Sequence, residues 1–557
     1  MTDHIKTPRT LIIGLDGATF KIIDPLVKGG CLPNLSKLMA QGVRGLLNAW
    51  PNMNSASSWS SIVTGYNPGQ HGIQDFGDAP LQKGSKWHPM TASERKKDPF
   101  WRILSAVGRY VGVINVPISY PADPIHGFML AGMDSPSIRS PGFAHPRDLL
   151  DELKLRNIDY LIDISNLSVI SQRDPYHYPA NVQRMVDARA RTILHLMKTR
   201  PWDILMAVFT APDRIQHYFY PDPQGTVDNP DWIPIRSLYE QIDSFLGEVS
   251  TLIDESTTVL IISDHGFGPV RNYSDYLNPL FSKLGLLSYR SRQSNLMGRL
   301  IKNLLLYGRK LFPKSFQRPL AMIFPKLHRR ALGERLYSDI DWSKSQAFAH
   351  LYGGKIYINL RGRQPEGVVS AEDYESVCEQ VKKILLQLVD PDTGKHLVRE
   401  VFRGQDLFHG PYTDQVADLF IRWDYDFIHG SVCYRGEGKP IMIQEVRAKG
   451  VKKRWVGQHL PEGIFIASGP GIRKGEHIEG ACIYDITPTI LYLQNHPVPS
   501  DMDGKVLTDI FTKERLLQYP VTRMEPKKIW GQSDSVKLDE EESRQIEERL
   551  RGLGYIE

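Results

Sequence analysis

Short apolar runs that end in polar residues recur along the chain, with helical stretches between them. The runs occupy residues 10–15, 111–116, 204–209, 258–262 and 464–467. Residues 183–199 and 374–388 carry the spacing of helices that bury one side. Continuous apolar strands alternating with helices are typical of a mostly parallel sheet covered on both faces. The sequence therefore predicts an α/β fold, with ligands bound beyond the carboxyl ends of the strands.

The segment 273–340 interrupts this rhythm, because it is helical and basic. Between Arg290 and Arg335 twelve Lys or Arg side chains accompany one acid, a net charge of +11. Apolar side chains recur every three or four residues from 296 to 311, with basic ones beside them, as in an amphipathic helix. We interpret 273–340 as an insertion or cap. The alternative is peripheral contact of 290–335 with an anionic membrane or a lipid-like substrate, and nucleic acid is disfavoured.

The remaining chain divides around this insertion. We assign residues 1–272 and 341–530 to a catalytic core and 531–557 to a C-terminal helix. Asp539 followed by Glu542 is a variant of the capping box that opens this last helix.

Composition points to a globular protein of a reducing compartment. Hydrophobic residues make up 41% of the 557 residues, and no apolar stretch reaches the roughly 18 residues of a membrane span. The first residues show no pattern of a signal peptide, and the four cysteines are scattered without a CxxC pair. We therefore expect a cytoplasmic location, with peripheral membrane contact as the alternative.

Asp and His side chains stand next to the ends of four of the apolar runs. They are Asp16, Asp213, His217, Asp264, His265 and His459. Carboxylate oxygen and imidazole nitrogen both bind zinc at about 2.0–2.2 Å. Each position alone has a structural explanation, since such residues also cap helices or lie on solvated faces. Their joint placement favours a metal site at the edge of the sheet.

A serine-rich stretch supplies a candidate nucleophile. Residues 55–64 are predicted to form a short helix with hydroxyls at its start. The N–H groups at a helix N-terminus can hold a phosphate, and a metal can lower the pKa of a nearby hydroxyl. The alternative is that these serines are ordinary helix caps.

A series of motifs resembles one known family over most of the chain. The motifs are GLDG at 14–17, WSSIVTG at 59–65 followed by NPGQHGI, APDRIQH at 211–217, SDHGFG at 263–268, GQHLPEGIFIASGPGI at 457–472, DITPTILYL at 485–493 and DMDGKVL at 501–507. In their order and number they resemble the type I phosphodiesterase/nucleotide pyrophosphatase family of the alkaline phosphatase superfamily.

This resemblance implies a fold, a nucleophile and a ligand set. The fold would be an alkaline-phosphatase-like three-layer sandwich, and Ser55 would be the nucleophile. One metal ion would be held by Asp213, His217 and His459, and a second by Asp16, Asp264, His265 and Ser55. The two divalent ions would be Zn²⁺, with Mn²⁺ as the alternative. The hypothesis is a metal-dependent phosphohydrolase, of phosphodiesterase or nucleotide pyrophosphatase type, that forms a phosphoserine.

The sequence departs from this family pattern at three positions. Ser55 replaces the common threonine, Ser58 stands where an asparagine commonly binds a phosphate oxygen, and Leu460 replaces a basic residue. We therefore keep Ser58 as the candidate substrate-binding residue and leave the substrate open among phosphorylated small molecules, nucleotides and lipid head groups. The alternatives are a phosphomonoesterase or phospho-head-group transferase on the same platform, or a metal-binding protein without activity. The segment SASSW lacks the Pro and Arg of a sulfatase nucleophile motif.

Overall fold

The computed structural model describes most of the chain. The described residues are 8–77, 88–164, 177–222, 225–269, 276–290, 340–350, 354–424, 431–436, 438–444, 456–527 and 538–553. The predicted amphipathic basic helix at 296–311 lies outside the described residues. Among the described helices, none has the length and apolar character needed to cross a membrane.

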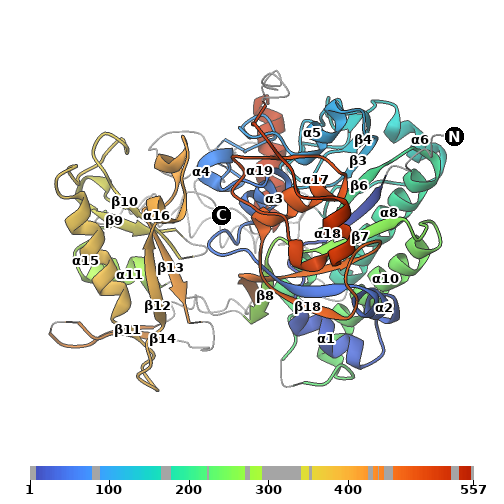
Figure 1. Cartoon of the computed structure of the whole chain (residues 1–557). Helices are drawn as coiled ribbons and strands as arrows, with labels where there is room; N and C mark the ends of the chain where they lie inside the picture. Colours follow the sequence, from blue (N-terminus) through green and yellow to red (C-terminus); the bar gives the residue numbers. More distant parts are fainter. Residues whose placement is uncertain are drawn as a thin grey trace, which may run out of the picture.

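A nine-stranded sheet forms the centre of the larger lobe (Figure 1). Its spatial order is β18 (Glu476–Cys482), β2 (Val43–Asn48), β17 (Glu462–Ser468), β7 (Thr257–Ile262), β1 (Arg9–Leu15), β6 (Ile204–Phe209), β3 (Val111–Ile114), β4 (Gly127–Leu130) and β5 (Ala144–His145). Strands β7, β1, β6, β3 and β4 run parallel, whereas β17 is antiparallel to both β7 and β2. Each apolar run predicted from the sequence falls on one of these strands, and the mostly parallel α/β fold is confirmed.

Alternation along the strands divides the buried side chains between two cores. In β1 the side chains of Leu11 and Ile13 enter one core, and that of Ile12 enters the other. Helices cover both faces, which makes three layers. The first core contains side chains of α1 (Phe20–Lys28), α2 (Pro33–Gln41), α6 (Leu149–Leu155), α8 (His177–Thr199), α9 (Ala211–Phe219), α10 (Ile233–Ser250) and α19 (Glu540–Leu553). The second contains side chains of α3 (Ser55–Thr64), α5 (Phe100–Ala106) and α17 (Ile486–Leu493).

The described residues of 276–444 form a second lobe with its own core (Figure 1, yellow and orange). Its two sheets have the orders β12-β13-β10-β9 and β11-β14-β15. Its elements are α11 (Leu277–Lys283), β9 (Ala347–Ala349), β10 (Lys355–Ile358), α15 (Tyr374–Leu386), β11 (Leu388–Val389), β12 (Val398–Arg403), α16 (Gly404–Leu407), β13 (Leu419–Trp423), β14 (Ser431–Tyr434) and β15 (Ile441–Gln444).

The strands between 347 and 444 pair with one another and, among the described residues, not with the central sheet. The proposed division into a catalytic core of 1–272 and 341–530, an insertion of 273–340 and a C-terminal helix of 531–557 stays a prediction.

The second lobe packs against the segment that follows β2 in the larger lobe. The ring centroids of Trp50 and Phe402 are 4.8 Å apart, and the Tyr412 N–H donates to the Gly69 carbonyl over 2.9 Å. Helix α3 lies between these two contacts, so the second lobe meets the chain both before and after the helix that carries Ser55.

Smaller elements complete the described structure. They are α4 (Pro68–His71), β8 (Gly266–Pro269) paired with β16 (Gly457–Leu460), α18 (Lys513–Gln518), β19 (Val498–Pro499) paired with β20 (Arg523–Met524), and short 3-10 turns at Pro230–Trp232, Trp342–Lys344, Thr413–Gln415, Ile483–Asp485 and Thr508–Ile510. At the start of α19 the Glu542 N–H donates to the Asp539 carboxylate over 2.7 Å, and the Asp539 N–H donates back to Glu542 over 3.2 Å. The predicted capping box is therefore present.

Candidate active site

One edge of the central sheet collects the predicted Asp and His side chains. Asp16 directly follows β1, and Asp264 follows β7 by two residues. Asp213 lies in the first turn of α9, the helix after β6. His459 precedes β17, but β17 is antiparallel to β7, so its beginning lies at the edge where β7 ends. The reversed strand thus delivers His459 to the same edge as the other candidates.

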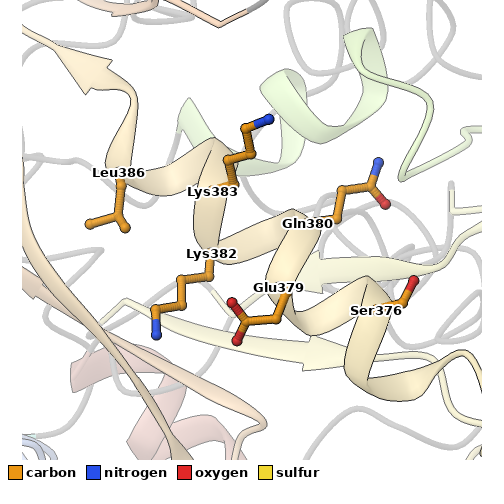
Figure 2. A pocket seen from close by; sticks show the side chains of 6 residues that line it. All are labelled: Ser376, Glu379, Gln380, Lys382, Lys383 and Leu386. Atoms are coloured by element: carbon orange, nitrogen blue, oxygen red, sulfur yellow. The ribbon is translucent and has the colours of Figure 1, made fainter.

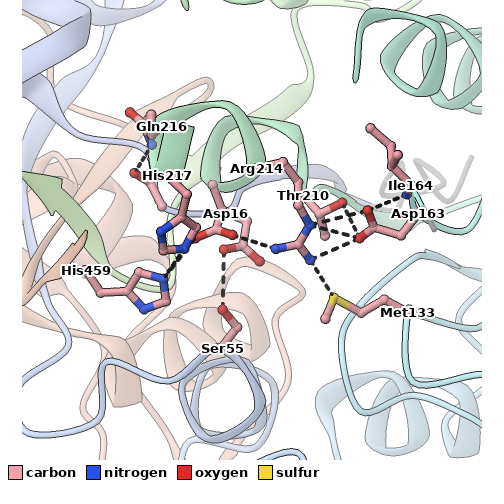
Figure 3. A network of polar contacts seen from close by, with 12 residues as sticks. Asp16, Ser55, Met133, Asp163, Ile164, Thr210, Arg214, Gln216, His217 and His459 are labelled. Carbon is pink, nitrogen blue, oxygen red and sulfur yellow. Dashed lines mark hydrogen bonds and ion pairs between the residues drawn. The ribbon is translucent and has the colours of Figure 1, made fainter. Parts of the chain in front are cut away.

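Asp213, His217 and His459 form the first group (Figure 3). Asp213 Oδ1 lies 3.3 Å from His217 Nε2 and 3.0 Å from His459 Nε2. The two Nε2 atoms are 3.2 Å apart. The helical i, i+4 spacing of Asp213 and His217 places both side chains on one face of α9, as the sequence predicted.

Asp16, Asp264, His265 and Ser55 form the second group. His265 Nε2 lies 3.6 Å from Asp16 Oδ1 and 3.5 Å from Asp264 Oδ2. Ser55 Oγ lies 3.4 Å from Asp16 Oδ1 and 3.3 Å from His265 Nε2. All four side chains are fully buried. The rings of His265 and His459 stack with centroids 3.7 Å apart, so the two groups are contiguous.

Each of the three histidines is oriented by a backbone carbonyl. The Nδ1 atoms of His217, His265 and His459 lie 3.1, 3.0 and 2.7 Å from the carbonyl oxygens of Gly457, Gly266 and Met53. A carbonyl only accepts, so Nδ1 carries the proton in each neutral ring. The lone pair of each Nε2 therefore points into the cluster, because a hydrogen bond from the other ring nitrogen fixes the tautomer and orientation of a histidine for metal binding.

Burial and charge shift the pKa values in opposite directions across the cluster. Burial, followed by the charges of Asp264 and Asp213, raises the pKa of Asp16 well above its ordinary value. Burial raises the pKa of Asp264 to about 7. Burial also favours a protonated Asp213, but the charges and hydrogen bonds of His217 and His459 outweigh it and lower that pKa. The buried carboxylates thus need cations beside them to stay ionised together.

The donor atoms fit divalent cations. Asp16, Asp264 and His265 present atoms within 4.8 Å of one another, as do Asp213, His265 and His459. Asp264 Oδ2 is buried and has no hydrogen-bond partner among the described residues, although such an atom is costly to leave unpaired. Carboxylate oxygen with neutral imidazole nitrogen is a ligand set that zinc accepts. The structure therefore brings together all six predicted ligands and Ser55.

Local structure fixes Ser55 at the first position of helix α3. Asn54 is the N-cap, and its Oδ1 accepts from the Ala56 N–H over 3.0 Å. The Asn54 amide donates to Asp75 over 2.8 Å, which holds the cap in place. Helix α3 ends at Gly65, whose φ of 78° is the left-handed conformation that glycine adopts without strain. The hydroxyl of Ser55 therefore lies at the positive end of a buried helix.

A glycine turn joins three of the motifs. Gly17 has a φ of 68°, its N–H donates to Asp264 Oδ1 over 3.2 Å, and its carbonyl accepts from Gln216 over 2.8 Å. A β-carbon there would approach Phe267 to 3.0 Å and His265 to 3.3 Å. Only glycine meets both requirements without strain, and its place in GLDG is thereby explained.

Three contributors to the site were missed in the sequence. Trp59 Nε1 donates to Asp16 Oδ2 over 3.2 Å. Arg214 donates to Asp213 Oδ2 over 2.6 Å and to Asp163 Oδ2 over 3.0 Å. Trp59 and Arg214 stand inside motifs quoted for the resemblance, so their positions were available. Asp163 stands alone after a short apolar stretch, and no spacing connects it to Arg214.

Two other features lie apart from the cluster. Ser58 Oγ contacts the carbonyls of Asn52 and Asn54, so its proton is directed at the backbone, and its role in substrate binding stays a prediction. A cavity of about 570 Å³ lies on α15 in the second lobe, lined by Ser376, Glu379, Gln380, Lys382, Lys383 and Leu386 (Figure 2). None of these lining residues belongs to the cluster, which makes this cavity separate from the candidate active site.

Comparison with known proteins decides the family. The profile of the type I phosphodiesterase / nucleotide pyrophosphatase family matches residues 10–427, more than half of the chain. The chain belongs to this family. As a member of the type I phosphodiesterase / nucleotide pyrophosphatase family, it is a hydrolase that acts on phosphoric ester or phosphoanhydride bonds. Two groups of candidate metal ligands are present among the described residues.

Three solved structures are similar to this chain over most of its length. Phosphonoacetate hydrolase from Sinorhizobium meliloti 1021, in complex with phosphonoformate, has 15% identity and a TM-score of 0.50 over 87% of this chain and 95% of its own. An inactive variant of murine ectonucleotide pyrophosphatase / phosphodiesterase 5, in complex with AMP, has 13% identity and a TM-score of 0.49 over 91% and 100%. A mutant of alkaline phosphatase PafA has 11% identity and a TM-score of 0.49 over 92% and 100%. No curated protein matches the sequence.

Proposed function

We propose that this protein is a two-metal phosphodiesterase or nucleotide pyrophosphatase that works through a phosphoserine on Ser55. The observation that carries the proposal is the position of Ser55 Oγ, 3.4 Å from Asp16 Oδ1 and 3.3 Å from His265 Nε2 in the fully buried second group. Asp213, His217 and His459 would hold one divalent ion. Asp16, Asp264, His265 and Ser55 would hold the other. The nitrogen and oxygen ligand set favours Zn²⁺, with Mn²⁺ as the alternative.

The residues of the chain divide the reaction between them. Bound divalent ions would lower the pKa of the Ser55 hydroxyl and offset the charge of the phosphoryl oxygens. Ser55 Oγ, having released its proton, forms a bond to phosphorus while the ester or anhydride bond opposite breaks and its oxygen leaves with the electron pair. Water then attacks the phosphoserine, the Oγ–phosphorus bond breaks, and a proton returns to Ser55. The N–H groups at the start of α3 would favour the anionic phosphoryl group throughout.

Substitution of Ser55 tests the nucleophile. We expect Ser55→Ala to lower turnover of an aryl phosphodiester by several orders of magnitude. Mass spectrometry after an acid quench should find phosphate on the peptide that contains Ser55 in the wild type and not in the variant. Ser60→Ala is the matched control, because Ser60 Oγ is also buried on α3 but has no hydrogen-bond partner among the described residues. Near wild-type turnover by Ser55→Ala would exclude this nucleophile.

The substrate class is tested with a matched pair of compounds. Family membership favours diesters and pyrophosphates over monoesters, so aryl phosphodiesters should be hydrolysed faster than aryl phosphomonoesters. A chelator should abolish both activities, and Zn²⁺ should restore them. Preference for the monoester would favour the phosphomonoesterase alternative, and transfer of the phosphoryl group to added alcohols would favour a transferase.

We also propose that the protein acts in a reducing compartment on a small phosphorylated substrate. The four cysteines, Cys31, Cys378, Cys433 and Cys482, are all free, which agrees with a cytoplasmic location. Contact of the basic segment 290–335 with anionic membranes remains part of this proposal. Co-sedimentation with acidic vesicles at low salt tests it, and the absence of binding would remove the membrane contact.

A further inference from the structure

A buried arginine connects the first ligand group to a carboxylate outside the cluster (Figure 3). Arg214 Nη1 donates to Asp213 Oδ2 over 2.6 Å. Its Nη2 and Nε donate to Asp163, with a shortest distance of 3.0 Å. The Arg214 side chain is 1% exposed, and those of Asp163 and Asp213 are 0% exposed. The guanidinium therefore bridges two carboxylates in the interior, one of which is a candidate metal ligand.

Asp163 is itself held by its surroundings. Its Oδ1 accepts from the Ile164 N–H over 2.7 Å, and its Oδ2 accepts from the Thr210 hydroxyl over 3.2 Å. Thr210 directly precedes α9, the helix that carries Asp213 and Arg214. Asp163 thus fixes the guanidinium from the side opposite to the metal ligands.

The bridge leaves one oxygen of Asp213 for the cluster. Arg214 donates to Oδ2, and Oδ1 lies 3.3 and 3.0 Å from the Nε2 atoms of His217 and His459. Asp213 would therefore present Oδ1 to its cation. A carboxylate without this restraint could rotate about its terminal bond, which is a soft torsion.

We propose that Arg214, fixed by Asp163, is the positioning residue for Asp213 and sets the affinity of the first ligand group for its cation. This inference rests on the proposed function. Hydrogen-bonded partners of ligating carboxylates typically contribute about 10–100-fold to metal affinity. Arginine suits the position because its rigid planar fork bonds two carboxylates at once, which the single ammonium of lysine does less well.

A second arginine nearby provides a control. Arg189 is also 1% exposed, and its guanidinium donates to the carbonyls of Leu161, Ile162 and Val208. These contacts hold the segment next to Asp163, but none of them reaches a candidate metal ligand. Arg189→Lys should therefore reproduce the structural cost of removing a buried guanidinium without disturbing Asp213.

The experiment measures Zn²⁺ binding to the full chain by competition with a chromogenic chelator. The variants are Arg214→Lys, Asp163→Asn and Arg189→Lys, with circular dichroism as the test of folding. We expect Arg214→Lys and Asp163→Asn to raise one of the two Zn²⁺ dissociation constants by about 10–100-fold and to leave the other unchanged. Excess Zn²⁺ should restore most of the turnover of Asp163→Asn. Arg189→Lys should lower thermal stability and keep both dissociation constants.

Each outcome decides the inference. Wild-type affinity at both sites in folded Asp163→Asn and Arg214→Lys would overturn it. An equal loss in Arg189→Lys, together with wild-type affinity in Asp163→Asn, would show that Arg214 acts only through the fold. If Arg214→Lys does not fold, the measurement on Asp163→Asn alone tests the inference, because this substitution keeps the shape of the side chain at 163 and leaves Asp213 unchanged. Failure of the wild type to bind two ions would instead overturn the proposed function.

Discussion

The Nε2 atoms of His217 and His459 face each other at 3.2 Å, although the Nδ1 atom of each ring is already bonded to a backbone carbonyl. In these tautomers each neutral ring has its lone pair on Nε2, so the two lone pairs would face each other and repel. A proton or a cation shared between them removes that repulsion, and Asp213 Oδ1 completes the same group. The backbone thus prepares the two rings to share a positive charge.

Removal of one of these rings should empty one metal site. We expect His459→Ala to bind one zinc ion per chain where the wild type binds two, since a ligand contributes more than the ~10–100-fold of an outer-shell partner. Metal analysis after desalting measures this directly. His126→Ala is the control, because the Nδ1 atom of His126 also contacts a carbonyl, that of Gly108, but the ring is exposed and outside the cluster. Two ions retained by His459→Ala would contradict the ligand assignment.

Removal of the metal should destabilise the whole fold. Asp16, Asp213 and Asp264 are fully buried within one cluster, and without cations their charges oppose one another. A ligand that binds only the folded state at about 100 times its dissociation constant adds about 2.7 kcal/mol. We therefore expect a chelator to lower the Tm by several degrees and Zn²⁺ to restore it, measured by thermal unfolding. An unchanged Tm would mean that the cluster takes up no cation.

The turn at Gly17 should tolerate no side chain. Gly17→Ala combines a φ of 68° with close approaches to Phe267 and His265, so we expect lost stability together with weaker metal binding. Gly30 has a φ of 75° but nothing within 4 Å of an added β-carbon. Gly30→Ala should show only the cost of about 1–2 kcal/mol for a left-handed residue. Equal effects of the two substitutions, on stability and on metal affinity, would show that the turn does not shape the site.

The identity of the candidate ligand residues was easier to predict than the strand pairing that brings them together. Asp16, Asp213 and Asp264 follow strands that the apolar runs predicted, and parallel strands bring their carboxyl ends to one edge. His459 precedes its strand, so the same rule would have placed it at the opposite edge. Only the antiparallel pairing of β17 with β7 resolves this, and pairing direction is a tertiary property that one strand's sequence does not contain.

The second lobe and the Arg214 bridge show the same limit. The strands between 347 and 444 find their partners within the lobe. Arg214 follows a candidate ligand on a helix, where an arginine is usually solvated. Its burial depends on Asp163, which approaches from a separate part of the chain. Long-range pairing of this kind leaves no periodic signal in the sequence.

A buried histidine should make stability fall in acid. Burial, reinforced by the charge of Arg95, lowers the pKa of His71 to about 3. The Ile73 N–H donates to Nδ1 over 3.1 Å, and Nε2 lies 3.0 Å from the Ser61 hydroxyl, so the neutral ring is bonded on both sides. In the unfolded chain His71 has a pKa of about 6.5, so below that pH it binds a proton that it does not bind in the folded state. The free energy of unfolding therefore falls as the pH falls below about 6.5.

Replacement of His71 should remove this dependence. We expect the stability advantage of the wild type over His71→Asn to shrink by about 1.4 kcal/mol for each pH unit below ~6.5. Urea unfolding at pH 7.5, 6.0 and 5.0 measures the difference. A difference that stays constant over this range would show that His71 does not titrate on unfolding.

The reversed strand β17 has a consequence for biosynthesis. Five of the six ligand side chains and Ser55 belong to the first half of the chain, whereas His459 is encoded behind the entire second lobe. Chains are made from the amino end, and domains begin to fold in that order. A nascent chain therefore carries its candidate nucleophile long before it can complete the candidate ligand set, and any product terminated ahead of β16 would keep Ser55 without His459.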